Sequence, residues 1–216
     1  MKNFDGIIFD IDGTLADTHE LIFDTFNHVI EKYLNKRMSN DEIVALFGPT
    51  EDVILKEYMA ERYGEARNDY YEYYRKNHKE KAPAYPGIEE VLIYLKSRSI
   101  PVGIFTGKGR KSSEITLKEL GLIDYFDLII TGDDVEKHKP DPEGIRLFLS
   151  RFNLQGERVL MVGDVANDVK AARDAGVKCA LVLWDKFSRE KFSGVEADFK
   201  FYSVEEFKKF IFDNFE

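Results

Sequence analysis

The chain has 216 residues, of which 44% are hydrophobic, and its 40 Asp and Glu residues outnumber its 31 Lys and Arg residues to give a formal net charge of −9. This excess of carboxylates, without a block of Lys or Arg, argues against a nucleic-acid partner because the chain would repel phosphates. No apolar stretch approaches the roughly 20 residues that a membrane span needs, and a single cysteine excludes an intramolecular disulfide, so we expect a cytoplasmic globular protein.

The first apolar run, Gly6 to Phe9, is uniformly hydrophobic, which is typical of a strand buried on both faces. The next comparable run begins only at Val102. A single crossover helix needs about a dozen residues, far fewer than this interval offers. An additional unit is therefore inserted between the first two strands.

The inserted unit is predicted to be helical. One helix begins near Asp17 and places seven apolar residues on one face, namely Leu21, Ile22, Phe26, Val29, Ile30, Tyr33 and Leu34. Thr50 is the expected N-cap of a second helix from Glu51 to Tyr63. The Tyr-rich stretch from Asp69 to Lys81 predicts a third helix, whose tyrosines are expected to pack within the insert.

The domain boundaries follow from this insert. Residues 82–87 contain two prolines and a glycine and form the expected return linker, and a helix from Ile88 to Arg98 leads back to the sheet. We therefore assign residues 1–15 and 85–216 to a main domain and residues 16–84 to a small helical domain.

The second half of the chain alternates apolar runs with helical patterns. The runs are Val102–Phe105, Leu128–Ile130, Val159–Val162 and Ala180–Leu183, and the helical patterns are Arg110–Leu120, Pro142–Phe152 and Asn167–Ala175. A last helix is expected from Ser203, which forms a capping-box pattern with Glu206. These repeats predict an α/β fold with helices on both faces of a parallel sheet. Cys179 lies among the apolar residues of the last run, and we expect a buried, unreactive thiol.

Polar residues follow four of the apolar runs. The segments are Asp10-Ile11-Asp12-Gly13-Thr14, Thr106-Gly107-Lys108, Lys139-Pro140-Asp141-Pro142 and Gly163-Asp164-Val165-Ala166-Asn167-Asp168. Taken singly, each is explained as a turn, a solvated charge or a helix cap. Because ligands of an open parallel sheet bind beyond the carboxyl ends of its strands, their joint placement at one sheet edge predicts a functional site.

Four carboxylates meet at that edge, those of Asp10, Asp12, Asp164 and Asp168, and their charge must be neutralised. Oxygen ligands without a clustered His or Cys favour a hard cation, and Mg²⁺ is the usual one where a phosphate completes the shell. The sequence therefore predicts a Mg²⁺ site.

Further groups at the same edge suit a phosphoryl group. Lys139 and the hydrogen-bond donors of Thr106 and Gly107 would bind it. Asp10 is then a candidate nucleophile, and Asp12 a candidate general acid that later deprotonates the attacking water.

In order and spacing, the four segments resemble the four motifs of the haloacid dehalogenase-like (HAD) hydrolase superfamily, and the resemblance covers nearly the whole chain. The helical insert is similar to the cap of the subclass that includes phosphoglycolate phosphatases, pyrophosphatases of the PpaX type, beta-phosphoglucomutases and dehalogenases. The resemblance implies a Rossmann-like α/β core, a cap that closes over the substrate and an aspartyl-phosphate intermediate. The implied activity is a Mg²⁺-dependent phosphatase, a phosphoric monoester hydrolase acting on a phosphoglycolate-like metabolite or on pyrophosphate.

The resemblance also implies a role for each motif residue. Asp10 is the nucleophile, Asp12 the general acid and base, and Thr106 binds the phosphoryl group while Lys139 stabilises its charge. The backbone carbonyl of Asp12 also contributes to the metal site, and the implied Mg²⁺ ligands are Asp10, Asp12, Asp164 and Asp168, the last either directly or through water.

Substrate choice is expected to lie in the cap and just after each motif. Many relatives carry Asn or Thr where this chain has Gly107, which leaves Lys108 as the expected substrate contact. The segment Phe47-Gly48-Pro49-Thr50 resembles the cap segment of phosphoglycolate phosphatases, in which Gly48 would let the loop approach the substrate. The same segment is equally explained as an ordinary loop that ends in a helix N-cap.

Two other functions compete with the phosphatase. Mutases resembling this family carry a His five residues after the Asp of the Asp-Thr pair, where this chain has Ile22, and His19 is out of register. A binding module without catalysis would not need every motif residue. Asp12 favours the phosphatase over the dehalogenases, which lack an acid there.

The remaining candidates have weaker signals. His138 either faces the phosphate or lies in a solvated loop, Trp184 either shields the cap interface or packs, and His28 and His78 have no assigned role. We expect a small phosphorylated molecule as partner and a monomer or weak dimer.

Overall fold

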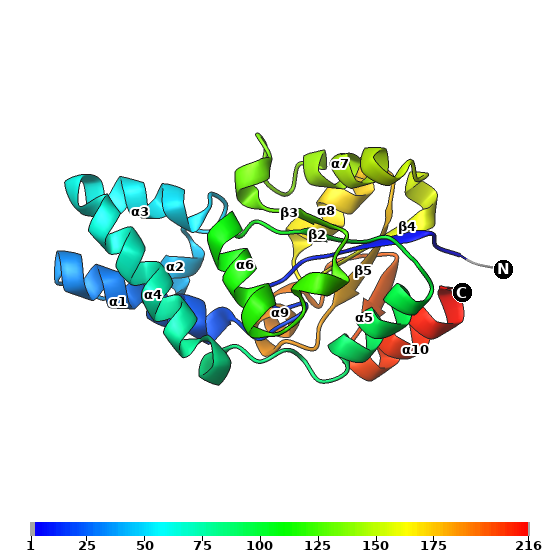
Figure 1. Ribbon diagram of the computed structural model, residues 1–216, viewed down its shortest axis with the longest axis horizontal. Helices are drawn as coiled ribbons and strands as arrows, with labels where there is room; N and C mark the ends of the chain where they lie inside the picture. Colours follow the sequence, from blue (N-terminus) through cyan, green and yellow to red (C-terminus); the bar gives the residue numbers. More distant parts are fainter. Residues whose placement is uncertain (1–2, 216) are drawn as a thin grey trace.

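The computed structural model describes residues 3–215, so residues 1, 2 and 216 of the predicted main domain lie outside the described part of the chain. Its centre is a parallel sheet with the strand order β3-β2-β1-β4-β5-β6 (Figure 1). The strands are β1 (Gly6–Phe9), β2 (Val102–Phe105), β3 (Leu128–Ile130), β4 (Val159–Gly163), β5 (Lys178–Val182) and β6 (Phe199–Phe201). The predicted α/β fold with a Rossmann-like parallel sheet is confirmed.

The strands lie close to the predicted apolar runs, with one exception. The first three occupy the predicted residues, whereas β5 begins at Lys178 and ends at Val182 instead of spanning 180–183. Strand β6 was not predicted, because its three residues are half-buried and alternate around Lys200 at the edge of the sheet.

Helices cover both faces of this sheet, as expected. Helices α5 (Ile88–Ser97), α6 (Arg110–Glu119) and α10 (Val204–Asn214) pack on the face that carries Ile7 and Phe9, and α7 (Glu143–Phe152) and α8 (Ala166–Ala175) pack on the face that carries Ile8. Figure 1 shows α5 and α10 together on one side of the strands and α7 with α8 on the other. Alternation along a strand sends successive side chains into the two hydrophobic cores.

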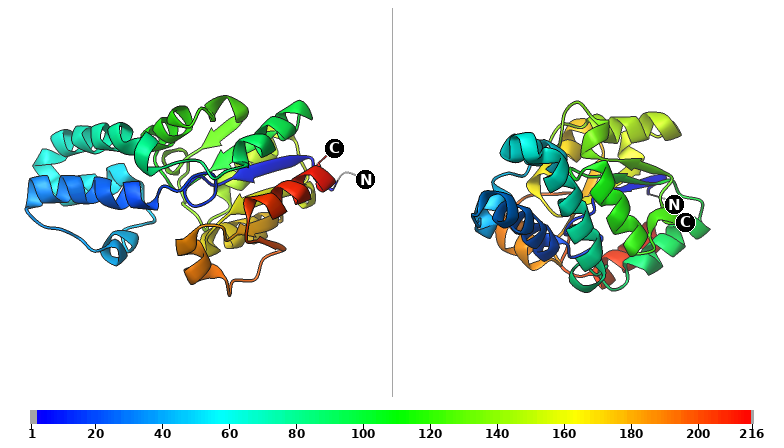
Figure 2. Two further views of the ribbon diagram at one scale, coloured as in Figure 1. Left: turned by 90° about the horizontal axis from the view of Figure 1, so that it is seen from below. Right: turned by 60° about the vertical axis from the view of Figure 1, so that its left-hand side comes forward.

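Between β1 and α5 the chain forms a separate group of helices, here called the cap helices. They are α1 (His19–Leu34), α2 (Asn40–Val44), α3 (Glu51–Met59) and α4 (Tyr63–Lys81), with a 3₁₀ turn at Ala60–Arg62. These helices share a hydrophobic cluster of their own and extend away from the sheet in both views of Figure 2. The chain leaves and re-enters the main body at an antiparallel bridge between Ala16 and Ala84. This separate cluster supports the proposed division at residues 16 and 84.

Some helix ends differ from the sequence prediction. Helix α3 ends at Met59 instead of Tyr63, because Ala60 has φ = +46° and breaks the helix. Thr50 occupies the N-cap position, but its Oγ1 accepts no capping hydrogen bond. Leu34 was expected on the buried face of its helix and is 37% exposed.

At α10 the predicted capping box is half present. Ser203 Oγ accepts a hydrogen bond from the backbone N of Glu206 at 3.3 Å. The Glu206 carboxylate accepts from the backbone N of Tyr202 instead of that of Ser203.

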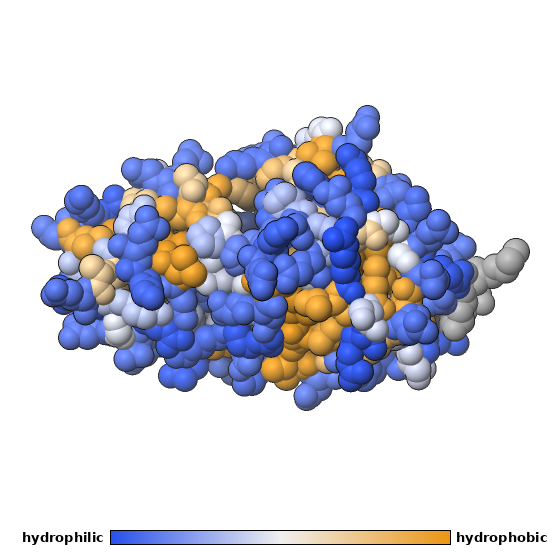
Figure 3. Space-filling model, turned by 90° about the horizontal axis from the view of Figure 1, so that it is seen from above, coloured by the Kyte–Doolittle hydropathy of each residue, from blue (hydrophilic) through white to orange (hydrophobic). Residues whose placement is uncertain are grey.

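The surface and the helices bear on the expectation of a globular protein without a membrane span. On the face drawn in Figure 3, hydrophilic residues predominate, and hydrophobic residues gather in patches over the cap helices and the main body. Among the described residues, no helix combines the length and the apolar character needed to cross a membrane. Cys179 is 1% exposed, and its burial raises the pKa of the thiol.

Candidate active site

The strand order brings the four polar segments together. Strand β1 lies at the centre of the sheet with β2 on one side and β4 on the other, all parallel. Asp10 follows β1, Thr106 follows β2 and Asp164 follows β4, so these residues lie at the same carboxyl-end edge, next to the cap helices. Lys139, which comes from the loop after β3, reaches the same point.

Three of the four predicted carboxylates form a buried cluster. One carboxylate oxygen from each of Asp10, Asp164 and Asp168 lies within 4.8 Å of the other two. Lys139 forms ion pairs with two of these carboxylates, with Nζ 3.1 Å from Asp10 Oδ1 and 2.6 Å from Asp168 Oδ1. The same ammonium donates a hydrogen bond to the backbone carbonyl of Phe105 at 3.2 Å. One lysine therefore faces three carboxyl groups.

The electrostatics of this cluster favour a further cation. Burial raises the pKa of Asp10 to about 6, against the opposing effect of Lys139 and with the support of neighbouring carboxylates. Burial and then the charges of Asp10 and Asp168 raise the pKa of Asp164 well above its ordinary value. Asp10 Oδ1 is buried and, apart from its ion pair with Lys139, has no hydrogen-bond partner among residues 3–215. A buried set of oxygen ligands with surplus negative charge suits Mg²⁺.

Asp12 lies outside this carboxylate cluster. Lys108 Nζ donates to its two carboxylate oxygens at 3.1 Å and 3.2 Å, and Thr18 Oγ1 donates to Oδ1 at 2.5 Å. Burial alone would raise the pKa of Asp12, but Lys108 and Thr18 outweigh it and hold the pKa below its ordinary value. The side chains of Asp10 and Asp12 thus have different partners, although only one residue separates them.

Lys108 is held from several sides. Its backbone N donates to Thr106 Oγ1 at 3.2 Å, and its Nζ lies 4.9 Å from the centre of the Tyr74 ring. Burial lowers the pKa of Lys108, but Asp12, Tyr74 and Glu51 together more than compensate and the pKa is raised. The sequence suggested Lys108 as a substrate contact, and the structure adds a buried ion pair with Asp12.

A cavity of about 370 Å³ lies above these residues, between the main body and the cap helices. The predicted binding residues all line it, namely Gly48, Thr106, Gly107, Lys108 and Lys139, together with Asp10, Asp12 and Asp164. Asp168 is fully buried behind the cavity wall. Gly48 has φ = +146°, a backbone conformation that favours glycine.

Two of the histidines line this cavity, whereas the tryptophan does not. His19 and His138 line the cavity, and the buried Nδ1 atom of each has no hydrogen-bond partner in the described part of the chain, although His19 Nδ1 lies 3.8 Å from Asp185 Oδ1. Trp184 does not line it and packs between Tyr85 and Phe207, at ring distances of 6.1 Å and 5.7 Å. His78 is buried beside Thr116.

The structure also places residues at the site that sequence reasoning missed. Ser188 Oγ donates to Asp164 Oδ2 from helix α9 (Lys186–Phe192), and the Glu51 carboxylate lines the cavity from the start of α3. Neither residue belongs to a recognisable motif, because its position depends on contacts between distant parts of the chain.

Comparisons with known proteins show what the chain is similar to. The sequence pattern of the family described as haloacid dehalogenase-like hydrolase matches residues 7–182. The chain is 34% identical over 198 residues to the pyrophosphatase PpaX of Bacillus velezensis, covering 92% of each chain, and 32% identical over 193 residues to the pyrophosphatase PpaX of Bacillus thuringiensis, covering 89% of each.

Solved structures share the fold. One from Haemophilus somnus, described as a predicted phosphoglycolate phosphatase, has a TM-score of 0.81 at 22% identity and covers 97% of this chain and 99% of its own. A candidate beta-phosphoglucomutase from Thermotoga maritima has a TM-score of 0.74 at 28% identity, with coverage of 97% and 99%.

Proposed function

Since this chain belongs to the haloacid dehalogenase-like hydrolase family, we propose that it is a Mg²⁺-dependent phosphatase that acts on pyrophosphate or on a small phosphate ester such as phosphoglycolate. The observation that carries this proposal is that two neighbouring carboxylates have different ion-pair partners. Asp10 lies in the acidic cluster beside Lys139, and Asp12 lies in a separate ion pair with Lys108. One carboxylate suits nucleophilic attack and the other suits proton transfer.

In the first step, a carboxylate oxygen of Asp10 attacks the phosphorus atom and the bond to the leaving oxygen breaks. Asp12, in its protonated form, donates its proton to that oxygen. In the second step, Asp12 accepts a proton from a water molecule as this water attacks the phosphorus atom, which releases phosphate and restores the Asp10 carboxylate. Lys139 stabilises the negative charge in both steps.

Asp10, Asp164 and Asp168 would hold Mg²⁺. The family resemblance implies that the backbone carbonyl of Asp12 would be a further ligand. When bound, this ion supplies the positive charge that allows an anionic phosphoryl group to approach three carboxylates. Thr106, with the backbone of Gly107, would hold the phosphoryl oxygens, and the cap helices with Gly48 would enclose the rest of the substrate.

The lowered pKa of Asp12 bears on the choice between the substrates. A carboxyl group with a low pKa is seldom protonated near neutral pH, so it suits leaving groups that need little protonation. Phosphate leaving from pyrophosphate is such a group, whereas the alcohol leaving from a phosphate ester is a stronger base. This argument and the similarity to two PpaX pyrophosphatases both favour pyrophosphate.

A phosphomutase is the alternative function, and one structural neighbour is a candidate beta-phosphoglucomutase. Ile22 lines the cavity at the position where mutases resembling this family carry a histidine. His19 also lines the cavity, but its position in the sequence is out of register with that histidine.

The purified protein should be assayed with Mg²⁺ against pyrophosphate, phosphoglycolate, beta-glucose 1-phosphate and p-nitrophenyl phosphate. We expect phosphate release that Asp10→Asn abolishes and that Asp174→Asn, a change at an exposed site on α8, leaves intact. Turnover by Asp10→Asn would refute the nucleophile. Isomerisation of the sugar phosphate without phosphate release would establish the mutase instead.

A further inference from the structure

Glu51, the first residue of α3, reaches from the cap helices to the main body. Its side chain is nearly buried, with 6% of the residue exposed. Glu51 Oε2 accepts a hydrogen bond from the backbone N of Gly109 at 2.9 Å, and Oε1 accepts one from Ser112 Oγ. Both donors belong to the N-terminal end of α6, which packs on the sheet.

Helix α6 lacks a cap of its own. Gly109 is its N-cap residue and offers no side chain, and the first turn carries Arg110 and Lys111 and no acidic residue. Two carboxylates from elsewhere supply the missing acceptors. Glu51 binds the Gly109 amide, and Asp133 Oδ2, from the loop after β3, accepts from the backbone N of Arg110 at 2.7 Å. Negative groups are stabilising at a helix N-terminus.

The main body has room for this contact because two of its residues are glycines. A Cβ atom at Gly109 would lie 2.8 Å from Glu51 Oε1, and a Cβ atom at Gly132 would lie 2.5 Å from Thr50 Cγ2. Gly109 has φ = −67°, which any residue adopts, so its backbone conformation does not require glycine. Glycine is required at this position because a side chain would occupy the space of the Glu51 carboxylate.

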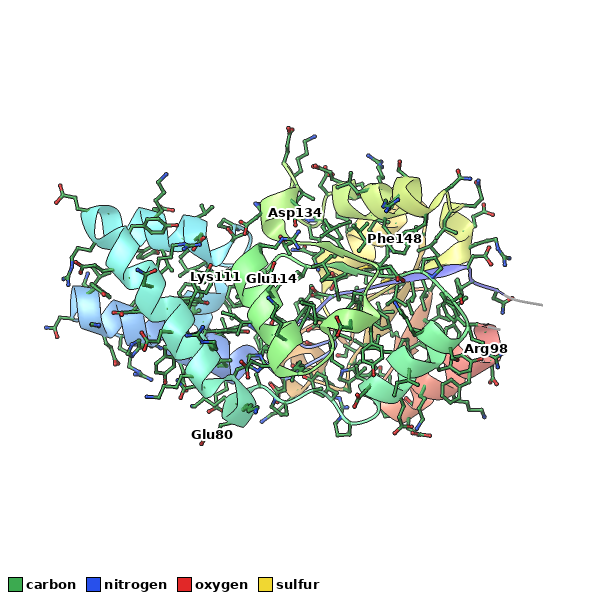
Figure 4. The ribbon with its side chains drawn as sticks, viewed as in Figure 1. Glu80, Arg98, Lys111, Glu114, Asp134 and Phe148 are labelled. Carbon is green, nitrogen blue, oxygen red and sulfur yellow. The ribbon has the colours of Figure 1, made fainter. Side chains whose placement is uncertain are left out.

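The same helix makes further contacts with the cap helices. Lys111 Nζ lies 4.3 Å from the centre of the Tyr71 ring, and Tyr74 OH lies 2.9 Å from Thr116 Oγ1. Figure 4 shows Lys111 and Glu114 on the part of α6 next to the cap helix α4. Helix α6 begins directly after the segment Thr106-Gly107-Lys108, so its N-terminus links the cap helices to the candidate phosphoryl-binding residues.

We propose that Glu51 is a positioning residue, a latch that holds the cap helices against the N-terminus of α6. In the latched arrangement, Phe47 and Gly48, which precede Glu51 by a few residues, line the cavity above Lys108. The geometric part of this inference stands alone, and its kinetic part rests on the proposed function. Without the latch, a smaller fraction of molecules has the cap in place, and the apparent affinity for substrate falls by that fraction.

The experiment is a double-mutant cycle with Glu51→Ala, Gly109→Ala and the double variant. Asp133→Asn is the matched control, because Asp133 caps the same helix from within the main body. Kinetics are measured with pyrophosphate and p-nitrophenyl phosphate under Mg²⁺. Hydrogen exchange is followed in the peptide covering residues 106–112, and thermal unfolding shows which variants fold.

We expect Glu51→Ala and Gly109→Ala each to raise KM about tenfold with kcat within about twofold, since the first removes the carboxylate and the second displaces it from the Gly109 amide. Both should also accelerate exchange in residues 106–112. In the Glu51→Ala background, Gly109→Ala should have little further effect, because the clash it introduces is with the missing side chain. Asp133→Asn should leave KM unchanged.

Two results would overturn the latch. If Gly109→Ala raised KM equally with and without Glu51, the two residues would act independently. If Glu51→Ala raised KM while Gly109→Ala did not, Glu51 would be a substrate contact only. Should neither substrate be turned over, the proposed function fails, and the exchange data still decide the latch: unchanged exchange in Glu51→Ala and Gly109→Ala refutes it.

Discussion

The ammonium group of Lys108 lies 3.1 Å and 3.2 Å from the two carboxylate oxygens of Asp12, which joins the candidate acid and base to the segment that follows the second strand. The Lys108 side chain is 4% exposed and that of Asp12 is 22% exposed, so the pair is shielded from water on the lysine side. Lys108 therefore acts on Asp12 as well as on anything bound in the cavity.

Lys108→Met should move the pH profile of kcat. Removing the ammonium group removes the largest effect that lowers the pKa of Asp12 and leaves burial to raise it. For p-nitrophenyl phosphate, the limb of the profile that reports Asp12 should shift to higher pH. Lys118→Met, at an exposed lysine of α6, is the control. An unshifted profile would show that Lys108 does not tune Asp12.

The stability of the metal-free protein should depend on the protonation of Asp10. Its pKa is raised from 3.8 to about 6, so the folded state binds this proton more tightly than the unfolded state. The contribution is favourable below pH 3.8 and is lost as the pH rises through 6. It amounts to about 3 kcal/mol for this difference in pKa.

Asp10→Asn should therefore stabilise the metal-free protein at pH 7.5 by more than at pH 5. Urea unfolding in the presence of EDTA, at both pH values, measures the two differences against the wild type. Equal differences at both pH values would mean that Asp10 titrates normally.

Mg²⁺ should raise the unfolding temperature of the wild type at pH 7.5. An ion that binds only the folded state adds about 2.7 kcal/mol at 100 times its dissociation constant. Asp164→Asn should lose most of this effect, because Asp164 supplies one of the clustered carboxylates, whereas Asp174→Asn should keep it. Equal stabilisation of all three proteins would place the ion elsewhere.

Gly144→Ala should destabilise the fold although alanine favours helices. A Cβ atom at Gly144 of α7 would lie 2.3 Å from Cδ2 of Phe105, the residue before Thr106. Overpacking of this kind costs about 1–3 kcal/mol. Gly64→Ala, in α4, meets nothing within 4 Å and should be neutral or stabilising. Chemical unfolding of the two variants compares them, and a stabilised Gly144→Ala would contradict this packing argument.

The elements that sequence reasoning found share one property. Strands β1, β2 and β3 and helices α7 and α8 carry hydrophobic patterns that are readable within a few residues. The elements it missed are short or lie at an edge, such as α2, α9 and β6, where burial depends on neighbours. Thr50 shows the same limit. It has the residue type and position of a helix cap, yet its methyl group faces Gly132 and its hydroxyl has no hydrogen-bond partner among the described residues.

The sequence by itself determined the parallel α/β fold, the helical insert and the identity of the residues at the strand ends, because hydrophobic periodicity and strand polarity are local properties. Only the tertiary structure decided how those residues pair. It separated Asp12 from the acidic cluster and joined it to Lys108, 96 positions away, and it placed Glu51 on Gly109, 58 positions away. The first pairing depends on the adjacency of strands β1 and β2, and the second depends on how the cap helices pack on α6. No local sequence pattern records either arrangement.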